Sequence, residues 1–217
     1  MKILVACEES QRVTFELRKR GHEAYSCDIL SPSGGGTQWH IKQDCTPLLN
    51  GNCTFKTMDN QEHTISGKWD MIIAFPPCTY LSNAGAKHLY PKGVLNQERF
   101  SKGQKAAQFF ITILNADCEK IVVENPIPSK IYNLPKYTQI IQPYEFGHPF
   151  QKRTCLWIKG LQKLKPTDIV DIRESTKIAG NWFNKGGKER QKNRAKTFQG
   201  IAKAIAEQWT DDLTKGK

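Results

Sequence analysis

Short apolar runs alternate along the chain with longer segments in which apolar positions recur every three or four residues. Four apolar runs rich in β-branched residues predict buried strands at 2–7, 23–29, 69–75 and 120–124. Helical spacing of apolar residues predicts three helices, at 11–20, 96–116 and 197–209. Ser10 is the expected cap of the first helix, and Gly21 follows its last turn.

The order of these segments predicts a single α/β domain spanning 1–217. A strand, a helix and a strand within the first 29 residues form a βαβ unit, which places its strands parallel. Segments 138–146 and 154–159 suit an antiparallel pair that closes the sheet, and 52–67 suits an inserted hairpin. We therefore expect a mostly parallel central sheet, helices on both of its faces and an antiparallel closing strand.

Composition supports a packed core and argues against a membrane protein. Hydrophobic residues make up 38% of the 217 residues and charged residues 24%, as in globular domains. The longest apolar runs, 71–75 and 109–114, are far shorter than the roughly 20 residues that cross a bilayer. Glu8, Glu9 and Glu16 interrupt any signal-peptide core. We expect a cytoplasmic protein with no membrane partner.

The seven cysteines are scattered, without a CxxC pair. Their odd number and the absence of a signal peptide favour reduced thiols over a disulfide framework. A zinc site needs ligands clustered at short spacings, so no metal site is expected.

Positive charge is concentrated toward the end of the chain. Residues 1–149 carry 16 basic and 14 acidic residues, whereas 150–217 carry 16 basic and 7 acidic. The basic segment near 178–196 includes the run 185–196, with six basic residues against one acidic. This asymmetry indicates a polyanionic partner, most simply nucleic acid, or alternatively a solvated basic loop.

Polar residues follow several predicted strands at their carboxyl ends, where α/β sheets bind ligands. Glu8, Glu9 and Ser10 follow the first strand, and Asp28 ends the second. A carboxylate in Asp28's position can accept two bonds from a ribose diol, and Asp44 can accept from an adenine amino group. The alternative for either acid is a helix cap or an ordinary loop carboxylate.

The sharpest feature is Pro76-Pro77-Cys78, where two prolines present a cysteine rigidly beyond a core strand. Such a cysteine acts as a nucleophile where nearby positive charge lowers its pKa, or is simply half-buried and structural. Glu124-Asn125-Pro126 ends the neighbouring predicted strand, so a proton donor and the cysteine can face one pocket.

These motifs, followed by Gln151-Lys152-Arg153, resemble the catalytic motifs of DNA cytosine-C5 methyltransferases in their usual order. The chain is most similar to short phage-encoded members of that superfamily, which lack a full target-recognition domain. The resemblance spans roughly residues 3–209. It implies a class I S-adenosylmethionine-dependent methyltransferase fold, which is Rossmann-like, in a protein of the host bacterial cytoplasm. It also implies a role in shielding phage DNA from restriction.

The resemblance implies a covalent mechanism. Cys78 would attack cytosine C6, Glu124 would hold N3, and Arg153 would hold the base or favour the thiolate. S-adenosyl-L-methionine would be held by the strand-end residues Cys7, Glu8, Glu9, Ser10, Asp28, Ile29, Asp44, Phe75 and Pro77. The substrate would contact Pro76, Thr79, Asn125, Gln151, Lys185, Lys188, Arg190, Lys192 and Arg194. Reaching a base in duplex DNA would require flipping it out of the stack.

The chain departs from the family pattern in several places. The first loop, 6–10, has no glycine, Cys155 replaces a second arginine, and the closing motif is Gly200-Ile201-Ala202. Only about 43 residues separate Arg153 from Thr197, too few for an ordinary target-recognition domain. Base-specific readout needs several positioned side chains, so we expect low sequence specificity on DNA.

Three other functions remain open from the sequence. The protein could modify a free cytidine nucleotide with the same chemistry, as the missing recognition domain suggests. It could be an inactive DNA-binding protein with this fold, as the altered first loop suggests. An amino-methyltransferase is a weaker alternative, because that chemistry wants an aromatic residue after Pro-Pro, where this chain has Cys78.

Overall fold

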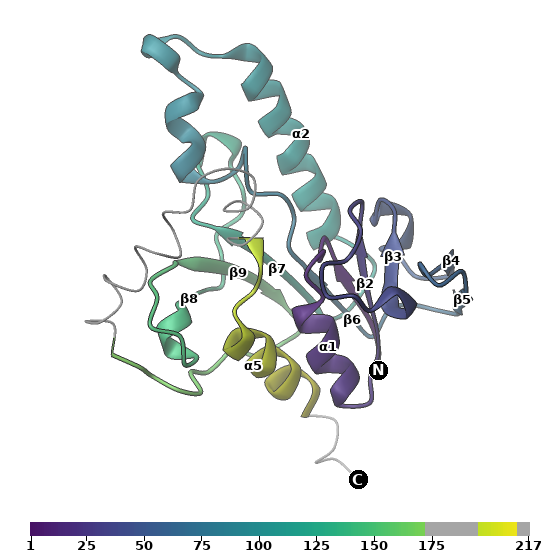
Figure 1. Ribbon diagram of the computed structural model, residues 1–217. Coiled ribbons are helices and arrows are strands. Elements are labelled where there is room, and N and C mark those ends of the chain that lie inside the picture. The colour runs from purple at the N-terminus through teal and green to yellow at the C-terminus, as the bar shows by residue number, and fades with distance from the viewer. Residues whose placement is uncertain (172–194, 212–217) are drawn as a thin grey trace.

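The computed structural model describes residues 1–171 and 195–211, and Figure 1 shows its arrangement. The strands are β1 (Lys2–Ala6), β2 (Glu23–Asp28), β3 (His40–Lys42), β4 (Cys53–Lys56), β5 (Glu62–Ile65), β6 (Met71–Ala74), β7 (Ile121–Pro126), β8 (Gln139–Ile141) and β9 (Thr154–Lys159). The α-helices are α1 (Arg12–Lys19), α2 (Gln97–Leu114) and α5 (Gln199–Thr210). Short 3-10 helices are η1 (Thr37–Trp39), η2 (Thr46–Leu48), η3 (Asn83–His88), η4 (Pro91–Gly93), η5 (Lys130–Tyr132) and η6 (Pro143–Glu145).

Seven strands form the central sheet, in the order β3-β2-β1-β6-β7-β9-β8. Neighbours run parallel from β3 to β7, whereas β9 is antiparallel to both β7 and β8. This order with one reversed strand near its end is the topology of the class I methyltransferase fold, a Rossmann-like arrangement. The predicted fold class is therefore confirmed, including the antiparallel closing strand.

Helices cover both faces of the sheet. Alternate residues of the central strands point to opposite faces, so Ile3 and Ile73 pack in one apolar core and Leu4 and Ile72 in the other. The second core also contains Phe110 of α2. The first is covered by α1 and α5, which lie side by side in Figure 1.

The other predicted strands and helices are present with small differences at their ends, but the strand expected over 138–146 is only β8, and η6 occupies the rest of that segment. Asn96 caps α2, because its side-chain oxygen accepts a bond of 2.9 Å from the Arg99 amide. A separate sheet of β4 and β5 occupies the region where a hairpin was expected, and its Phe55 packs edge-on against Tyr25 with ring centroids 5.0 Å apart.

The edge strand β3 was not predicted. It has three residues and pairs only with Ser26–Asp28 of β2. A segment this short shows too little alternation to be distinguished from a loop, so its position depends on pairing with β2.

Within residues 1–171 and 195–211, no helix is long and apolar enough to cross a membrane. In the same residues, no group of three or more His, Cys, Asp or Glu side chains is arranged to hold a metal ion.

Candidate active site

The candidate residues gather at one edge of the sheet. Strands β1, β2, β3, β6 and β7 are parallel, so their carboxyl ends lie at the same edge. The chain crosses between β1 and β6 at the point where the strand order reverses, which is where open α/β sheets form their ligand crevice. The residues after β1, β2 and β3 form one half of this edge, and those after β6 and β7 form the other.

The loop after β1 reaches an unusual backbone conformation without a glycine. Cys7 and Gln11 both have φ of 58°, in the left-handed region that L-residues rarely adopt. Each such residue costs about 1–3 kcal/mol unless its surroundings hold it in place. The Cys7 thiol has its pKa raised, chiefly by a hydrogen bond with Cys45 and then by burial. The loop after β1 therefore makes its turn with two strained residues, Cys7 and Gln11, and without a glycine.

Glu8 caps helix α1 instead of pointing to the crevice. Its carboxylate accepts bonds from the Val13 amide at 2.6 Å, the Thr14 amide at 3.2 Å and the Thr14 hydroxyl at 2.6 Å. The expected cap, Ser10, is wrong: the residue before the helix is Gln11, which makes no capping bond. Glu8 is only 3% exposed, so the structure does not bring it to the cofactor position that the resemblance implied.

Burial raises the pKa of Glu8 from 4.5 to about 7, although the bonds to α1 oppose the shift. The native state therefore holds this proton more tightly than the unfolded chain does. Stability from this group is greatest below pH 4.5 and falls by about 3 kcal/mol as the pH rises through 7. We expect Glu8→Gln to lose this pH dependence. Urea unfolding at pH 5 and pH 8 should show wild type losing about 2.5 kcal/mol relative to the variant.

Glu9→Gln is the control, because it removes a neighbouring, half-exposed charge from the same loop. Wild type and Glu8→Gln giving parallel curves of stability against pH would contradict the assignment.

The other residues of this half lie where a ligand can reach them. Asp28 is half-buried, one of its oxygens accepts from the Leu30 amide at 2.9 Å, and burial raises its pKa. Ile29 beside it is 71% exposed. Glu9 accepts from the Ser33 hydroxyl at 3.0 Å, and Ser10 is half-buried.

Asp44 is exposed and acts in part as a local cap. One oxygen accepts from both the amide and the hydroxyl of Thr46 at 2.7 Å. The loop-carboxylate interpretation therefore holds for that oxygen. Both bonds go to Oδ1, so they are compatible with a ligand on Oδ2.

A buried polar network forms the floor of this half. The Gln11 side chain both donates to the Gly36 carbonyl at 2.8 Å and accepts from the Gly36 amide at 2.9 Å. It also donates to Ser26, which contacts His40 at 2.8 Å, and His40 donates to the Leu30 carbonyl at 2.9 Å. This network fixes the loop that carries Asp28 and Ile29. Sequence reasoning missed it, since none of its members has a distinctive motif.

The cysteine loop is tied to the neighbouring strand. Asn125 is fully buried and donates to the Pro76 carbonyl at 3.2 Å. Farther along, the Asn83 amide donates to Ile127 at 2.8 Å and the Ser129 amide to Leu81 at 2.7 Å. These bonds hold the loop that carries Cys78 alongside the chain that leaves β7. Asn125 therefore serves as a structural link here, and its other side-chain atom, Oδ1, is buried without a partner.

Cys78 itself is half-exposed, between exposed Pro77 and exposed Thr79. Its carbonyl accepts from the amides of Leu81 at 3.2 Å and Ser82 at 3.0 Å, so the backbone turns directly after it. The thiol is accessible on a fixed loop, as a nucleophile requires.

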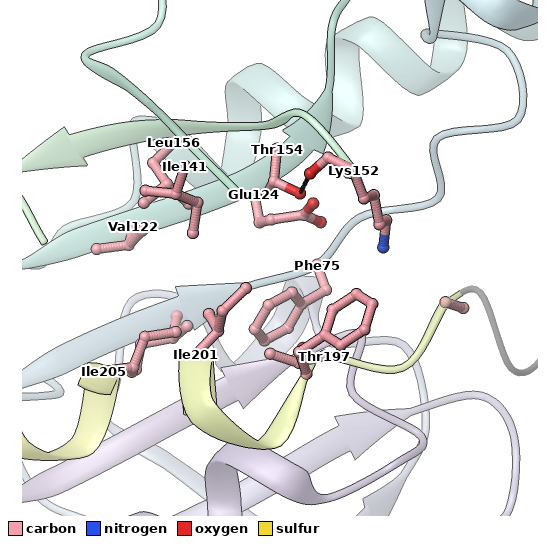
Figure 2. Close-up of a pocket in the computed structure, with 13 residues that line it drawn as sticks. Phe75, Val122, Glu124, Ile141, Lys152, Thr154, Leu156, Thr197, Ile201 and Ile205 are labelled. Carbon is pink, nitrogen blue, oxygen red and sulfur yellow. Dashed lines mark hydrogen bonds between the residues drawn. The ribbon is translucent and has the colours of Figure 1, made fainter. Parts of the chain in front are cut away.

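Glu124 lines a small cavity on the α5 side of the sheet (Figure 2). The cavity encloses about 30 Å³, and Phe75, Lys152, Thr154 and Thr197 also line it. Burial raises the pKa of Glu124, while the Lys152 charge and the Thr154 hydroxyl oppose the shift. A carboxyl group whose pKa is raised keeps its proton to higher pH, and in the protonated form it can donate to a basic ring nitrogen.

Lys152 occupies the position beside Glu124. Lys152 and Thr154 line the cavity. Figure 2 shows the Lys152 amine on the same side of this cavity as the Glu124 carboxylate. Arg153 is exposed and does not line the cavity. On extended backbone, adjacent side chains point to opposite faces, and this alternation around Arg153 is the signal that could have identified Lys152.

The remaining predicted contacts are dispersed or outside the described residues. Gln151 is exposed before β9. Lys185, Lys188, Arg190, Lys192 and Arg194, and most of the basic segment 178–196, lie outside the described residues.

No protein-family model matches the chain, and no curated protein matches it. Among solved structures, it is similar to an E. coli protein named as a candidate DNA modification methyltransferase encoded within a prophage. The two share 12% sequence identity with a TM-score of 0.44, over 78% of this chain and 51% of that one. The chain thus spans about half the length of that protein.

Proposed function

We propose that this protein transfers a methyl group from S-adenosyl-L-methionine to C5 of cytosine in DNA, through a covalent bond from Cys78 to C6. One observation carries the proposal. In a sheet of methyltransferase topology, the Cys78 loop follows β6, Glu124 lies in the adjacent parallel strand β7, and the bond from Asn125 to Pro76 ties the loop to that strand.

The residues at the ends of β1 and β2 fit the cofactor. Asp28 offers a carboxylate at the end of β2, the position suited to a ribose diol. Beside it, Ile29 exposes 71% of its surface, an apolar side chain against which a flat base can pack. Asp44 and the turn at Cys7 also lie on this half of the carboxyl edge of the sheet. Bound there, S-adenosylmethionine supplies an electrophilic methyl group.

The chain's own residues perform the activation of the base. Attack of the Cys78 thiolate on C6 breaks the C5–C6 double bond and moves its electrons toward C5 and N3. In its protonated form, which burial favours, Glu124 donates to N3 and stabilises the charge that develops there. After C5 has been substituted, loss of its proton allows the electrons to return and expel the Cys78 thiolate.

Two basic residues lie near these groups. Lys152 lies beside Glu124, and its charge opposes the rise in the pKa of that carboxyl. Arg153 remains a proposed ligand of the base or of the thiolate, from the exposed segment before β9. DNA is the proposed partner, with low sequence specificity, and protection of phage DNA from restriction is the proposed role.

Replacing Lys152 with methionine is expected to raise the pKa of Glu124 further, because it removes the charge that lowers it. The Glu124-dependent limb of the pH–rate profile should move to higher pH. On the alkaline side of that limb, the variant should therefore be faster than wild type at the same pH. Arg153→Met is the matched control, since it removes an adjacent charge outside the cavity and should leave that limb in place.

A mechanism-based trap tests the function. The protein is incubated with S-adenosylmethionine and duplex DNA containing 5-fluorocytosine, and covalent complexes are separated under denaturing conditions. Fluorine at C5 cannot leave as a proton does, so an active enzyme should remain bonded to the base. The adduct should be absent with Cys78→Ala and present with Cys53→Ala, a half-exposed cysteine in the hairpin.

The other outcomes separate the alternatives. An adduct with 5-fluorodeoxycytidine monophosphate and none with DNA would indicate a nucleotide-modifying enzyme. Cofactor binding with no adduct on either substrate would reject the covalent mechanism. DNA binding without cofactor binding would indicate the inactive DNA-binding protein.

A further inference from the structure

An arm projects from the sheet directly after Cys78. We define the basic arm as residues 79–105, which include η3, η4 and the first half of α2. Figure 1 shows the segment before α2, and the upper part of α2, extending away from the sheet. The arm leaves the same carboxyl edge on which the candidate active site lies.

The net charge of the arm differs from that of the other residues in 1–149. It carries five lysines and arginines against one glutamate, a net charge of +4. The remaining residues of 1–149 carry 11 basic and 13 acidic residues, a net charge of −2. The whole positive excess of the first 149 residues therefore lies on the arm, where Lys87, Lys92 and Lys105 are exposed.

The base of the arm is held firmly. Arg99 donates to the carbonyls of Thr79 at 3.0 Å and Gly85 at 3.3 Å, and its guanidinium lies 5.1 Å from the centre of the Tyr80 ring. On α2, Gly103 lies so close to Tyr132 that an added Cβ would come within 2.0 Å of its hydroxyl oxygen. The lysines therefore extend from an anchored frame, so less freedom is lost when they contact a partner.

The end of the arm exposes apolar side chains among these charges. Tyr90 is 48% exposed and Val94 is 70% exposed, on either side of η4. A merely solvated surface of lysines has no need of them. Positive charge combined with exposed apolar residues is typical of proteins that contact the DNA backbone and a groove together.

We propose that the basic arm binds the phosphate backbone of duplex DNA and positions the duplex over Cys78. This proposal rests on the proposed function and extends it to a defined surface. Lysine contacts with phosphates fix the position of a duplex and carry no base identity. The arm thus supplies the positioning that a recognition domain would otherwise give, without its sequence selectivity.

Salt-dependent binding tests the arm. The variant Lys87→Gln/Lys92→Gln/Lys105→Gln removes three exposed charges and leaves Lys102, which pairs with Glu98 at 2.5 Å. Affinity for a 20-base-pair duplex is measured by fluorescence anisotropy over a series of NaCl concentrations. The slope of log K against log[NaCl] should become shallower by roughly 2–3, and affinity at low salt should fall by about 10- to 100-fold.

The matched control is Lys56→Gln/Lys163→Gln/Lys203→Gln, which removes three exposed lysines from the hairpin, the loop after β9 and α5. It should leave the slope within about 0.5 of wild type. Thermal unfolding and cofactor binding establish that both triple variants are folded.

The arm and the proposed function fail in distinguishable ways. If wild type binds and methylates DNA and the arm variant does so equally, the arm proposal alone is overturned. If Lys188→Gln/Arg190→Gln/Lys192→Gln accounts for the whole salt dependence, the basic segment is the contact surface and the arm is not. If wild type binds no duplex at any salt concentration, both the arm and DNA as the substrate are rejected.

Discussion

Changing Cys78 to alanine is expected to abolish the proposed cytosine methylation while the protein keeps its fold and the proposed cofactor binding. The loop is held by its backbone, through the Pro76 carbonyl and the amides of Leu81 and Ser82. Removal of a covalent nucleophile costs at least roughly 10⁴-fold in rate, because no other group can form the bond to C6. Single-turnover transfer of a labelled methyl group to DNA measures the loss.

The same assay on Cys53→Ala provides the comparison, because that cysteine is also half-exposed but lies on β4, in the hairpin. It should retain wild-type activity. Isothermal titration with S-adenosylmethionine should give equal affinities for both variants. Activity of Cys78→Ala within 10-fold of wild type would eliminate the covalent route.

Gly200→Ala is expected to destabilise the protein strongly. The new Cβ would lie 1.8 Å from the Phe146 carbonyl oxygen, so the first turn of α5 would have to move. That turn is also fixed by a bond of 2.8 Å from the Gly200 amide to His148 Nε2. Overpacking against backbone cannot be relieved by a rotamer change, so we expect a loss of at least ~3 kcal/mol.

Gly21→Ala is a graded control for this prediction. An added methyl group meets nothing within 4 Å there, but the backbone φ of +80° is unfavourable for alanine. It should cost about 1 kcal/mol. Urea unfolding at one pH compares the two variants, and equal losses would show that the contact with Phe146 is relieved at little cost.

The sheet was largely predictable because its strands are buried on both faces. Residues such as Leu4 and Ile72 are fully buried, so each strand appears in the sequence as a continuous apolar run. The three-residue β3 was missed, because an edge strand of this length has no periodicity of its own. It is specified by pairing with β2 and by the contact of its own His40 side chain with Ser26.

Site residues whose motifs lie at strand ends could be predicted from the sequence. Residues whose role depends on the direction of the side chain were harder to predict. Pro76-Pro77-Cys78 and Glu124-Asn125 could be assigned to neighbouring strand ends before the sheet was known. In contrast, Glu8 turns inward to cap α1, because a carboxylate five residues before Val13 can reach the free amides of the first helical turn. That choice depends on the left-handed backbone at Cys7 and Gln11, which composition does not show.

The direction of Lys152 was missed for a related reason. The motif match emphasised Arg153, whereas the orientation of each side chain depends on the register of β9 with β7. Glu124 lies opposite Leu156, so residues two and four positions earlier, Thr154 and Lys152, line the same cavity.

Closure of the apolar core depends on α5, which is synthesised after all the strands and after α1 and α2. Ile201 and Ile205 of α5 form one wall of the cavity that holds Glu124, and α5 also covers α1, which is made first. At about 5–20 residues per second, the ribosome completes the strands and both candidate catalytic groups several seconds before α5 emerges. A stalled or nicked chain ending before residue 199 would have an open apolar face instead of a closed cavity. Truncated products are therefore expected to be recognised by proteases.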